Sequence, residues 1–312
     1  REFPNLRPRE FIEEMKDQVS DTVKRIYPMS MILSVAGLSS AAYYRKNEPI
    51  VQKVRPGPCP TIGDDQLLME VRKEILESPF LDEGYKKTWK RLQRRGIKAS
   101  KERVNRVMRE NDLLSVTRPK AERKENDHTG SIKTELPNRM WGTDGKRFYT
   151  LKEGWCWFFG IIDHFNDEII AWHASKSGNR FNAMEPLRTA VKKTYGSVEQ
   201  HVCKDLGLFL RSDHGSQYDS NDFQKELKFL GLIYSPAFVR SPECNGIIER
   251  FHRTLNEQVF DLCVFESLEE AQKAIGEFIE KYNRYWLIHR LGLKSPLEYR
   301  LDHENMRKYE AA

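Results

Sequence analysis

The order of apolar segments after residue 138 constrains the fold more than any other feature. Three short apolar runs come first, separated by Gly, Asn and Asp, at 139–151, 154–165 and 168–175. Helical patterns then alternate with two further apolar runs, at 207–213 and 232–236. Short apolar runs between turn residues predict strands, and the change to alternating helix and strand predicts a mixed sheet with helices on both faces. We therefore expect an α/β core over 138–265 and a helical extension over 266–312.

The first 137 residues predict helices only. Apolar residues at helical spacing predict one helix over 8–26, and Gly37 and Ser39 separate two short helices that complete a small helix-turn-helix within 1–50. A second helix-turn-helix unit is expected at 64–117, where Gly96 ends one helix, Ser100 caps the next, and Val104, Val107 and Met108 face the core. Pro- and Gly-rich residues 51–63 and polar residues 118–137 predict linkers.

Positive charge is concentrated in the helical half of the chain. Residues 1–137 contain 28 Lys or Arg and 21 Asp or Glu, whereas the rest contains 24 and 25. Residues 86–109 contain eleven basic residues and one acid, Glu102. Because this run coincides with a helix-turn-helix pattern, it predicts a DNA-binding surface, and a merely solvated helix surface is the alternative. The predicted contacts are Lys86, Lys87, Lys90, Arg91, Arg94, Arg95, Lys98, Lys101, Arg103, Arg106 and Arg109.

Cysteine usage and hydropathy exclude several classes of protein. The five cysteines are scattered and form no CxxC pair, which argues against a disulfide framework or a zinc site and suits a reducing cytosol. No uninterrupted apolar stretch is long enough to span a membrane, and no signal-peptide pattern opens the sequence. We therefore expect a soluble protein in the cytoplasm. Because the sequence begins with Arg1, it is expected to be a fragment or the downstream part of a longer product.

Three carboxylates occupy positions that a sheet of this kind could bring together. Asp144 lies inside the first predicted strand, Asp213 ends the fourth, and Glu249 lies on the helix expected over 242–262. If the first and fourth strands are neighbours, both aspartates can point to one edge, and the helix can bring Glu249 there. Crowded carboxylates repel one another and need a cation to ionise together. Oxygen ligands without Cys or His suit Mg²⁺ or Mn²⁺.

Two such ions, about 3.5–4 Å apart, would clamp the attacking and leaving oxygens of a phosphoryl displacement. Each residue also has a plainer interpretation, since a single Asp at a strand end is usually a turn residue and a single Glu on a helix usually faces solvent. The sequence around each carboxylate decides between these interpretations.

These surroundings carry a resemblance to a known family. The segments WGTDGKRF, SDHGSQYDS and SPECNGIIERFHRTL resemble the three catalytic blocks of the retroviral-integrase superfamily, and more closely those of the downstream-frame transposases of bacterial insertion sequences. Thirty-five residues separate Asp213 from Glu249, as in an Asp–Asp–35–Glu core. The helix-turn-helix segment 81–114 and the SPLEYR segment near the end are also similar to that family. Trp286 departs from the pattern, which usually has Arg there, and His289 is displaced by one position.

The resemblance implies a ribonuclease H-like mixed-sheet catalytic core preceded by all-α helix-turn-helix DNA-binding units. It implies that Asp144, Asp213 and Glu249 bind two Mg²⁺ (or Mn²⁺) ions and catalyse DNA cleavage and strand transfer. The active-site support residues that it implies are His214, Gly215, Ser216, Asn245 and Arg253. Its implied partners are double-stranded transposon ends and target DNA, further copies of the chain on paired ends, and the upstream-frame product of the same element. A copy-out, paste-in pathway and association with the bacterial nucleoid also follow from it.

Several residues and two other functions remain as alternatives. Asp163 is expected to be a structural turn residue, and His164, His214 and His252 have no zinc-site spacing. Three tryptophans, Trp141, Trp155 and Trp157, are expected in the core or on a sheet face, with base stacking as the alternative. A DNA-binding protein without catalysis and a metal-dependent nuclease of the same fold that hydrolyses without joining are the rival functions.

Overall fold

The computed structural model describes residues 7–45, 61–116, 134–236 and 245–310. Residues 1–59 and 60–312 are separate structural units, and each is described by itself. The expected linkers at 51–63 and 118–137 lie mostly outside the described residues. Among the helices described, none has both the length and the apolar character needed to cross a membrane.

The N-terminal unit contains three short helices, α1 (Pro8–Met15), α2 (Met29–Val35) and α3 (Ser40–Tyr44). Ile12, Ile32 and Leu33 form its small core. The prediction of one helix over 8–26 was wrong beyond Met15, because the apolar spacing continues but has nothing to pack against: Val19 and Val23 remain exposed. The expected cap at Ser39 is confirmed, since its side chain accepts a hydrogen bond from the backbone N–H of Ala42.

The second unit begins with a trio of helices, α4 (Asp64–Glu77), α5 (Tyr85–Arg94) and α6 (Lys101–Glu110). The predicted inward residues of α6 are confirmed, because Val104, Val107 and Met108 are buried in one cluster with Leu67, Val71 and Leu92. Ser100 caps α6, accepting a hydrogen bond from the backbone N–H of Arg103. Gly96 takes a positive φ in the α5–α6 turn, as its place after the first helix predicts.

A five-stranded mixed sheet follows, in the order β3-β2-β1-β4-β5. Its strands are β1 (Met140–Thr150), β2 (Gly154–Asp163), β3 (Ile169–Ser175), β4 (Phe209–Ser212) and β5 (Ile233–Pro236). The first three strands pair antiparallel, whereas β4 pairs parallel with both β1 and β5. The first and fourth strands are therefore neighbours, as the convergence of Asp144 and Asp213 requires. The predicted mixed-sheet, ribonuclease H-like fold class is confirmed.

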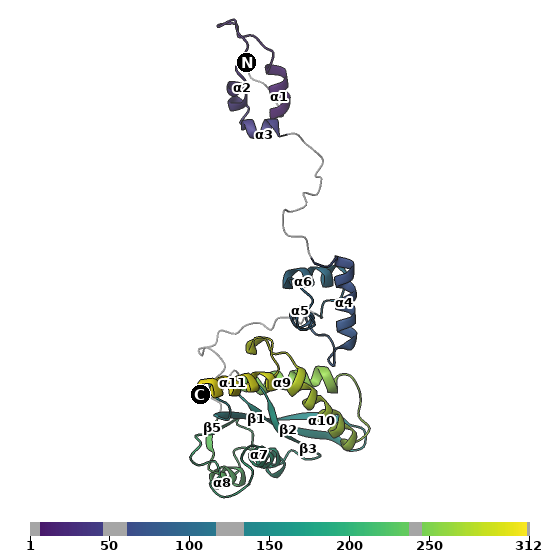
Figure 1. The fold of residues 1–312 in the computed structure, drawn as a ribbon, viewed down its shortest axis with the longest axis vertical. Coiled ribbons are helices and arrows are strands. Elements are labelled where there is room, and N and C mark those ends of the chain that lie inside the picture. The colour runs from purple at the N-terminus through teal and green to yellow at the C-terminus, as the bar shows by residue number, and fades with distance from the viewer. Residues whose placement is uncertain (1–6, 46–60, 117–133, 237–244, 311–312) are drawn as a thin grey trace. The chain divides into compact units, whose positions relative to one another are not determined.

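Helices cover both faces of the sheet, as predicted (Figure 1). On one face α7 (Arg180–Tyr195) and α8 (Asn221–Leu230) enclose one hydrophobic cluster. On the other face α9 (Gly246–Leu255) and α10 (Leu268–Tyr285) enclose a second, next to the short 3-10 helix η3 (His289–Leu291) and α11 (Pro296–Glu310).

The helix expected over 242–262 differs in its second half. Residues 242–244 lie outside the described part, and α9 passes at Asn256 into a π-helical segment, η2 (Asn256–Phe260). Asp163, expected to be structural, accepts hydrogen bonds from the backbone N–H groups of Asn138 and Phe165 and pairs with Arg300.

Candidate active site and DNA-binding surface

Asp144 lies in the middle of β1, opposite Gly160 of β2. One of its carboxylate oxygens, Oδ1, accepts a hydrogen bond of 2.7 Å from the backbone N–H of Gly145. The other, Oδ2, lies 3.4 Å from Nδ1 of His252 on α9. Since backbone and imidazole hold one oxygen each, the orientation of this carboxylate is set before any ligand binds.

Asp213 is the first residue after β4 and begins an exposed loop. Its Oδ1 accepts a hydrogen bond of 3.2 Å from the backbone N–H of Gly215. A Cβ atom at Gly215 would lie 2.8 Å from Nε2 of Gln217 and 3.1 Å from this Oδ1. A larger side chain at position 215 would therefore displace the end of the Gln217 side chain and crowd Asp213, so glycine fits this turn without rearrangement.

Glu249 lies in the first turn of α9, whose buried side packs on the sheet through Ile248 and Phe251. This packing orients the helix so that Glu249 remains exposed while His252, one turn later, is buried against Phe158. Asn245 is also buried, and its Nδ2 donates to the backbone carbonyl of Thr143, the residue before Asp144. Helix α9 therefore contacts β1 at Thr143 and at Asp144.

The three carboxylates repel one another through space. Partial burial raises the pKa of Asp213, and the negative charge of Asp144 raises it further. Although its side chain is exposed, partial desolvation by surrounding residues raises the pKa of Glu249, the charge of Asp144 raises it further, and the guanidinium of Arg253 opposes the rise. These through-space effects indicate that the strand, the loop and the helix hold the three carboxylates within electrostatic range of one another.

The site has the donor chemistry for a hard cation. Among the described residues, no three His, Cys, Asp or Glu side chains are close enough to form a ready metal cluster. Two buried atoms beside Asp144, Oδ1 of Asn245 and Nε2 of His252, have no hydrogen-bond partner in the described part of the chain. Buried polar atoms need partners, and the water shell of a bound ion supplies both donors and acceptors. The residues present therefore fit Mg²⁺ or Mn²⁺.

Two residues near Asp144 were not singled out by their sequence motifs. His252, considered only as part of a metal set, follows Glu249 by three residues and therefore shares its helix face. Lys146 follows Asp144 by two residues and therefore shares its strand face, and burial lowers the pKa of its ammonium group. The spacing of His252 from Glu249 and of Lys146 from Asp144 is the sequence signal that could have identified both residues.

The remaining support residues lie around the site with fewer contacts. His214 is exposed, with Nδ1 3.8 Å from Asp219 Oδ2. Ser216 is exposed in the same loop. Arg253 is exposed on α9, close enough to Glu249 to lower the pKa of that carboxyl group.

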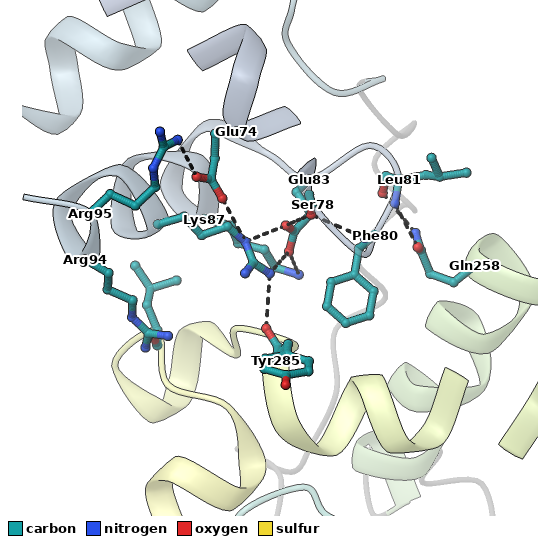
Figure 2. A network of polar contacts seen from close by, with 12 residues as sticks. Glu74, Ser78, Phe80, Leu81, Glu83, Lys87, Arg94, Arg95, Gln258 and Tyr285 are labelled. Carbon is teal, nitrogen blue, oxygen red and sulfur yellow. Dashed lines mark hydrogen bonds and ion pairs between the residues drawn. The ribbon is translucent and has the colours of Figure 1, made fainter. Parts of the chain in front are cut away.

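Several cations predicted to bind DNA instead contact the C-terminal helices (Figure 2). Arg91 forms an ion pair with Glu83, with Nε and Oε2 2.8 Å apart, and also donates to the backbone carbonyl of Tyr285. Arg94 donates to the carbonyl of Leu293 and pairs with Glu298 on α11. These bonds join α5 to the catalytic core.

Aromatic contacts complete this joint. The ammonium nitrogen of Lys87 lies 3.0 Å from the centroid of the Trp286 ring, and Lys86 lies 3.4 Å from a ring nitrogen of His289. Phe80, in the α4–α5 connection, is buried within the hydrophobic cluster of the catalytic core, 4.8 Å from Trp286 between ring centroids. Trp286 departs from the family pattern, and here it receives both the cation and the phenyl ring.

The other predicted cations fall into three groups. Arg95 pairs with Glu70 and Glu74, and Arg103 and Arg106 pair with Asp64, so these three hold the helix trio together. Lys90 donates to Gln93, and Lys101 lies 3.6 Å from Glu102. Lys98 and Arg109 are exposed and form no ion pair with any residue in the described ranges. Lys98 lies in the turn before α6, and Arg109 lies in the last turn of that helix.

Comparisons with known proteins cover nearly all of the second unit. An HTH-like domain model matches residues 63–121, and two integrase core domain models match residues 134–242 and 234–288. A transposase InsD for insertion element IS2A/D/F/H/I/K of Escherichia coli is 30% identical over 244 residues, which are 76% of this chain and 78% of the relative. The transposase InsD for insertion element IS2-9 of the K12 strain matches at the same identity and covers 77% of that relative.

Solved structures with a similar arrangement are more distant. The simian T-cell lymphotropic virus intasome, in complex with PP2A regulatory subunit B56 gamma, contains a chain 15% identical with a TM-score of 0.45, covering 67% of this chain and 69% of that one. The HTLV-2 integrase catalytic core domain in complex with magnesium is 18% identical with a TM-score of 0.40, covering 54% of this chain and 99% of that one.

Proposed function

This chain belongs to the bacterial insertion-sequence transposases with an integrase core domain, and we propose that it cleaves DNA at the ends of its element and joins the freed 3′-hydroxyl to a target strand. The observation that carries the proposal is the electrostatic coupling of Asp144, Asp213 and Glu249 at one site. Because the charge of Asp144 raises the pKa values of Asp213 and Glu249, these carboxylates are poorly placed for protein stability and well placed to share divalent cations.

The carboxylates of Asp144, Asp213 and Glu249 would hold Mg²⁺ or Mn²⁺, and we propose two ions. When bound, such ions activate an attacking oxygen and stabilise the leaving one. The chain itself fixes the geometry: the backbone N–H groups of Gly145 and Gly215 each orient one aspartate. Arg253 supplies an exposed cation beside Glu249 that suits a DNA phosphate.

The partners and the setting extend the same proposal. We propose that several copies of the chain act on paired ends of double-stranded DNA, together with the upstream-frame product of the same element. A copy-out, paste-in pathway on nucleoid DNA in the cytoplasm is the route that the family resemblance favours.

A strand-transfer assay tests the proposed reaction. Duplexes that tile the DNA flanking the coding sequence are incubated with the chain, a supercoiled target plasmid and Mg²⁺. We expect branched or joined products that depend on Mg²⁺ or Mn²⁺ and disappear with EDTA. Nicked products without joined species would support the nuclease instead. DNA binding without any cleavage would support the silent DNA-binding protein.

DNA recognition by the exposed cations Lys98 and Arg109 gives a second expected result. We expect the double variant Lys98→Ala/Arg109→Ala to weaken binding to element ends and to reduce the slope of log Kd against log salt by about 2, because each phosphate contact contributes about 0.9 to that slope. The control is Arg95→Ala, whose guanidinium pairs with Glu70 and Glu74, and its slope should stay close to that of the wild type. Equal slopes for all three proteins would exclude Lys98 and Arg109 as phosphate contacts.

A further inference from the structure

A group of aromatic and basic side chains occupies the hairpin end of β1 and β2. Arg147 lies opposite Trp157 and Tyr149 lies opposite Trp155 in the strand register, so all four side chains project from one face of the sheet. The guanidinium carbon of Arg147 is 5.2 Å from the ring centroid of Trp155 and 5.4 Å from that of Trp157. The rings of Tyr149 and Trp155 meet edge to face at 5.6 Å. We call these four residues the hairpin column.

The hairpin column is exposed at one end and anchored at the other. Tyr149 is 49% exposed and Trp155 is 58% exposed, both high values for large aromatic side chains. Trp157 is half-buried, stacks on the buried ring of Phe159 at 5.9 Å, and packs against the cluster beneath α7. A Cβ atom at Gly178 would lie 2.3 Å from the Trp157 ring, so the backbone holds that ring tightly. The column is therefore a preformed platform with open aromatic surface.

The charge of the hairpin column indicates what covers it. Arg147 is exposed and forms no ion pair with any of the residues described, and its guanidinium stacks between two indole rings. Burying this cation against an apolar protein surface would be unfavourable because its charge would lose water without gaining a partner. A nucleic acid strand instead offers phosphates to the guanidinium and bases to the aromatic faces.

The position of the hairpin column relative to the carboxylates favours the same occupant. Arg147 is three residues beyond Asp144 on β1, about 10 Å along the strand. The pairing of β1 with β4 covers only Met140–Gly142, so within the described residues the β1 edge between Asp144 and Tyr149 has no partner strand. An odd residue separation places Arg147 and Asp144 on opposite faces, and this open edge connects the two faces.

We propose that the hairpin column binds unpaired bases of a DNA strand that leaves the carboxylate site across the open edge of β1. This inference rests on the proposed function, because it assumes that DNA reaches Asp144. Stacking on Tyr149 and Trp155 would tolerate any base sequence, since every base has an aromatic face. Arg147 would bind the backbone phosphate between stacked bases.

Binding of a duplex with a single-stranded oligothymidine extension, compared with the same duplex with blunt ends, tests the proposal. We expect the wild type to prefer the extended DNA, and Trp155→Ala and Tyr149→Ala each to weaken that preference about tenfold, the scale of one base-stacking contact. Trp155→Phe should keep most of the preference because it keeps an aromatic face. The control is Phe229→Ala, which removes another exposed aromatic side chain, on α8.

Two results would overturn the proposal. Equal affinities of wild type and Trp155→Ala for the extended DNA would exclude base stacking at the hairpin column. A change in oligomeric state by light scattering, without any change in DNA preference, would show that the column joins copies of the chain. Strand transfer measured in parallel separates this inference from the proposed function. If the chain joins DNA but the hairpin-column variants bind extended DNA as the wild type does, only the inference about the hairpin column is refuted. If binding depends on the hairpin column but no joined product forms, only the proposed function is refuted.

Discussion

Asp213→Asn is expected to lower the rates of DNA cleavage and joining about a thousandfold. The variant keeps an oxygen to accept the backbone hydrogen bond from Gly215, but it loses the negative charge that a divalent cation requires. Metal-ion catalysis contributes several kcal/mol, and about 4 kcal/mol corresponds to about a thousandfold in rate. Rates measured on pre-cleaved ends would separate the joining step from the cleavage step.

The same variant should unfold at a higher temperature than the wild type in metal-free buffer at neutral pH. The pKa of Asp213 is raised in the folded state by burial and by Asp144, so ionisation of this carboxyl group opposes folding. The protonated carboxyl group of Asp213 contributes to the stability of the folded state. This contribution is fully present below the ordinary Asp pKa of 3.8 and is lost as the pH rises through the raised pKa of the folded state. The difference in unfolding temperature should therefore shrink in acid, and Mg²⁺ should stabilise only the wild type.

The matched control is Asp222→Asn, which removes the same charge from the exposed start of α8. Asp222 pairs with Arg180 and has no contact with the carboxylate site in the described structure. Its activity should stay within a few-fold of that of the wild type. Full joining activity in Asp213→Asn, or an equal loss in Asp222→Asn, would contradict the assignment of Asp213.

Phe80→Ala is expected to lower the free energy of unfolding of the catalytic core by about 3–5 kcal/mol, the usual effect of removing a buried phenyl ring. Phe80 belongs to the helix-turn-helix part of the sequence, yet it is 3% exposed and packs with Phe278 and Trp286 in the core cluster. Urea denaturation followed by both tryptophan fluorescence and circular dichroism would measure the change.

Leu81→Ala is the control for Phe80→Ala. Leu81 is the next residue and its side chain is 56% exposed, while its backbone forms two hydrogen bonds with the side-chain amide of Gln258. The substitution preserves those bonds, so its effect should stay within about 0.5 kcal/mol. Similar small effects from both variants would show that Phe80 does not join the helix trio to the core.

The sequence predicts the sheet well because the pattern of each strand is local. Short apolar runs between turn residues identify all five strands, and the family motifs predict Asp144, Asp213 and Glu249 as the catalytic carboxylates. The continuous apolar spacing over 8–26 misleads because spacing shows which residues could be buried, not whether a partner surface exists. Val23 remains 67% exposed for that reason.

The joint between the helix trio and the core could not be predicted for a different reason. Arg91 and Arg94 look like ordinary members of a basic helix, and their partners Tyr285 and Glu298 lie about two hundred residues away in the sequence. A charge count cannot distinguish a cation held by a distant carboxylate or carbonyl from one available to DNA. Only the tertiary contacts show that Arg91 and Arg94 are held by the C-terminal part of the chain.

Among the described residues, the β1 edge between Asp144 and Tyr149 has no partner strand, which has a consequence for the protein in concentrated solution. A strand edge with free backbone N–H and C=O groups is a template for pairing with another chain and hence for aggregation. Lys146 and Arg147 lie on this edge, and charged side chains at such positions discourage that pairing by mutual repulsion. Screening by concentrated salt weakens the repulsion, so handling at moderate ionic strength should keep the purified protein dispersed.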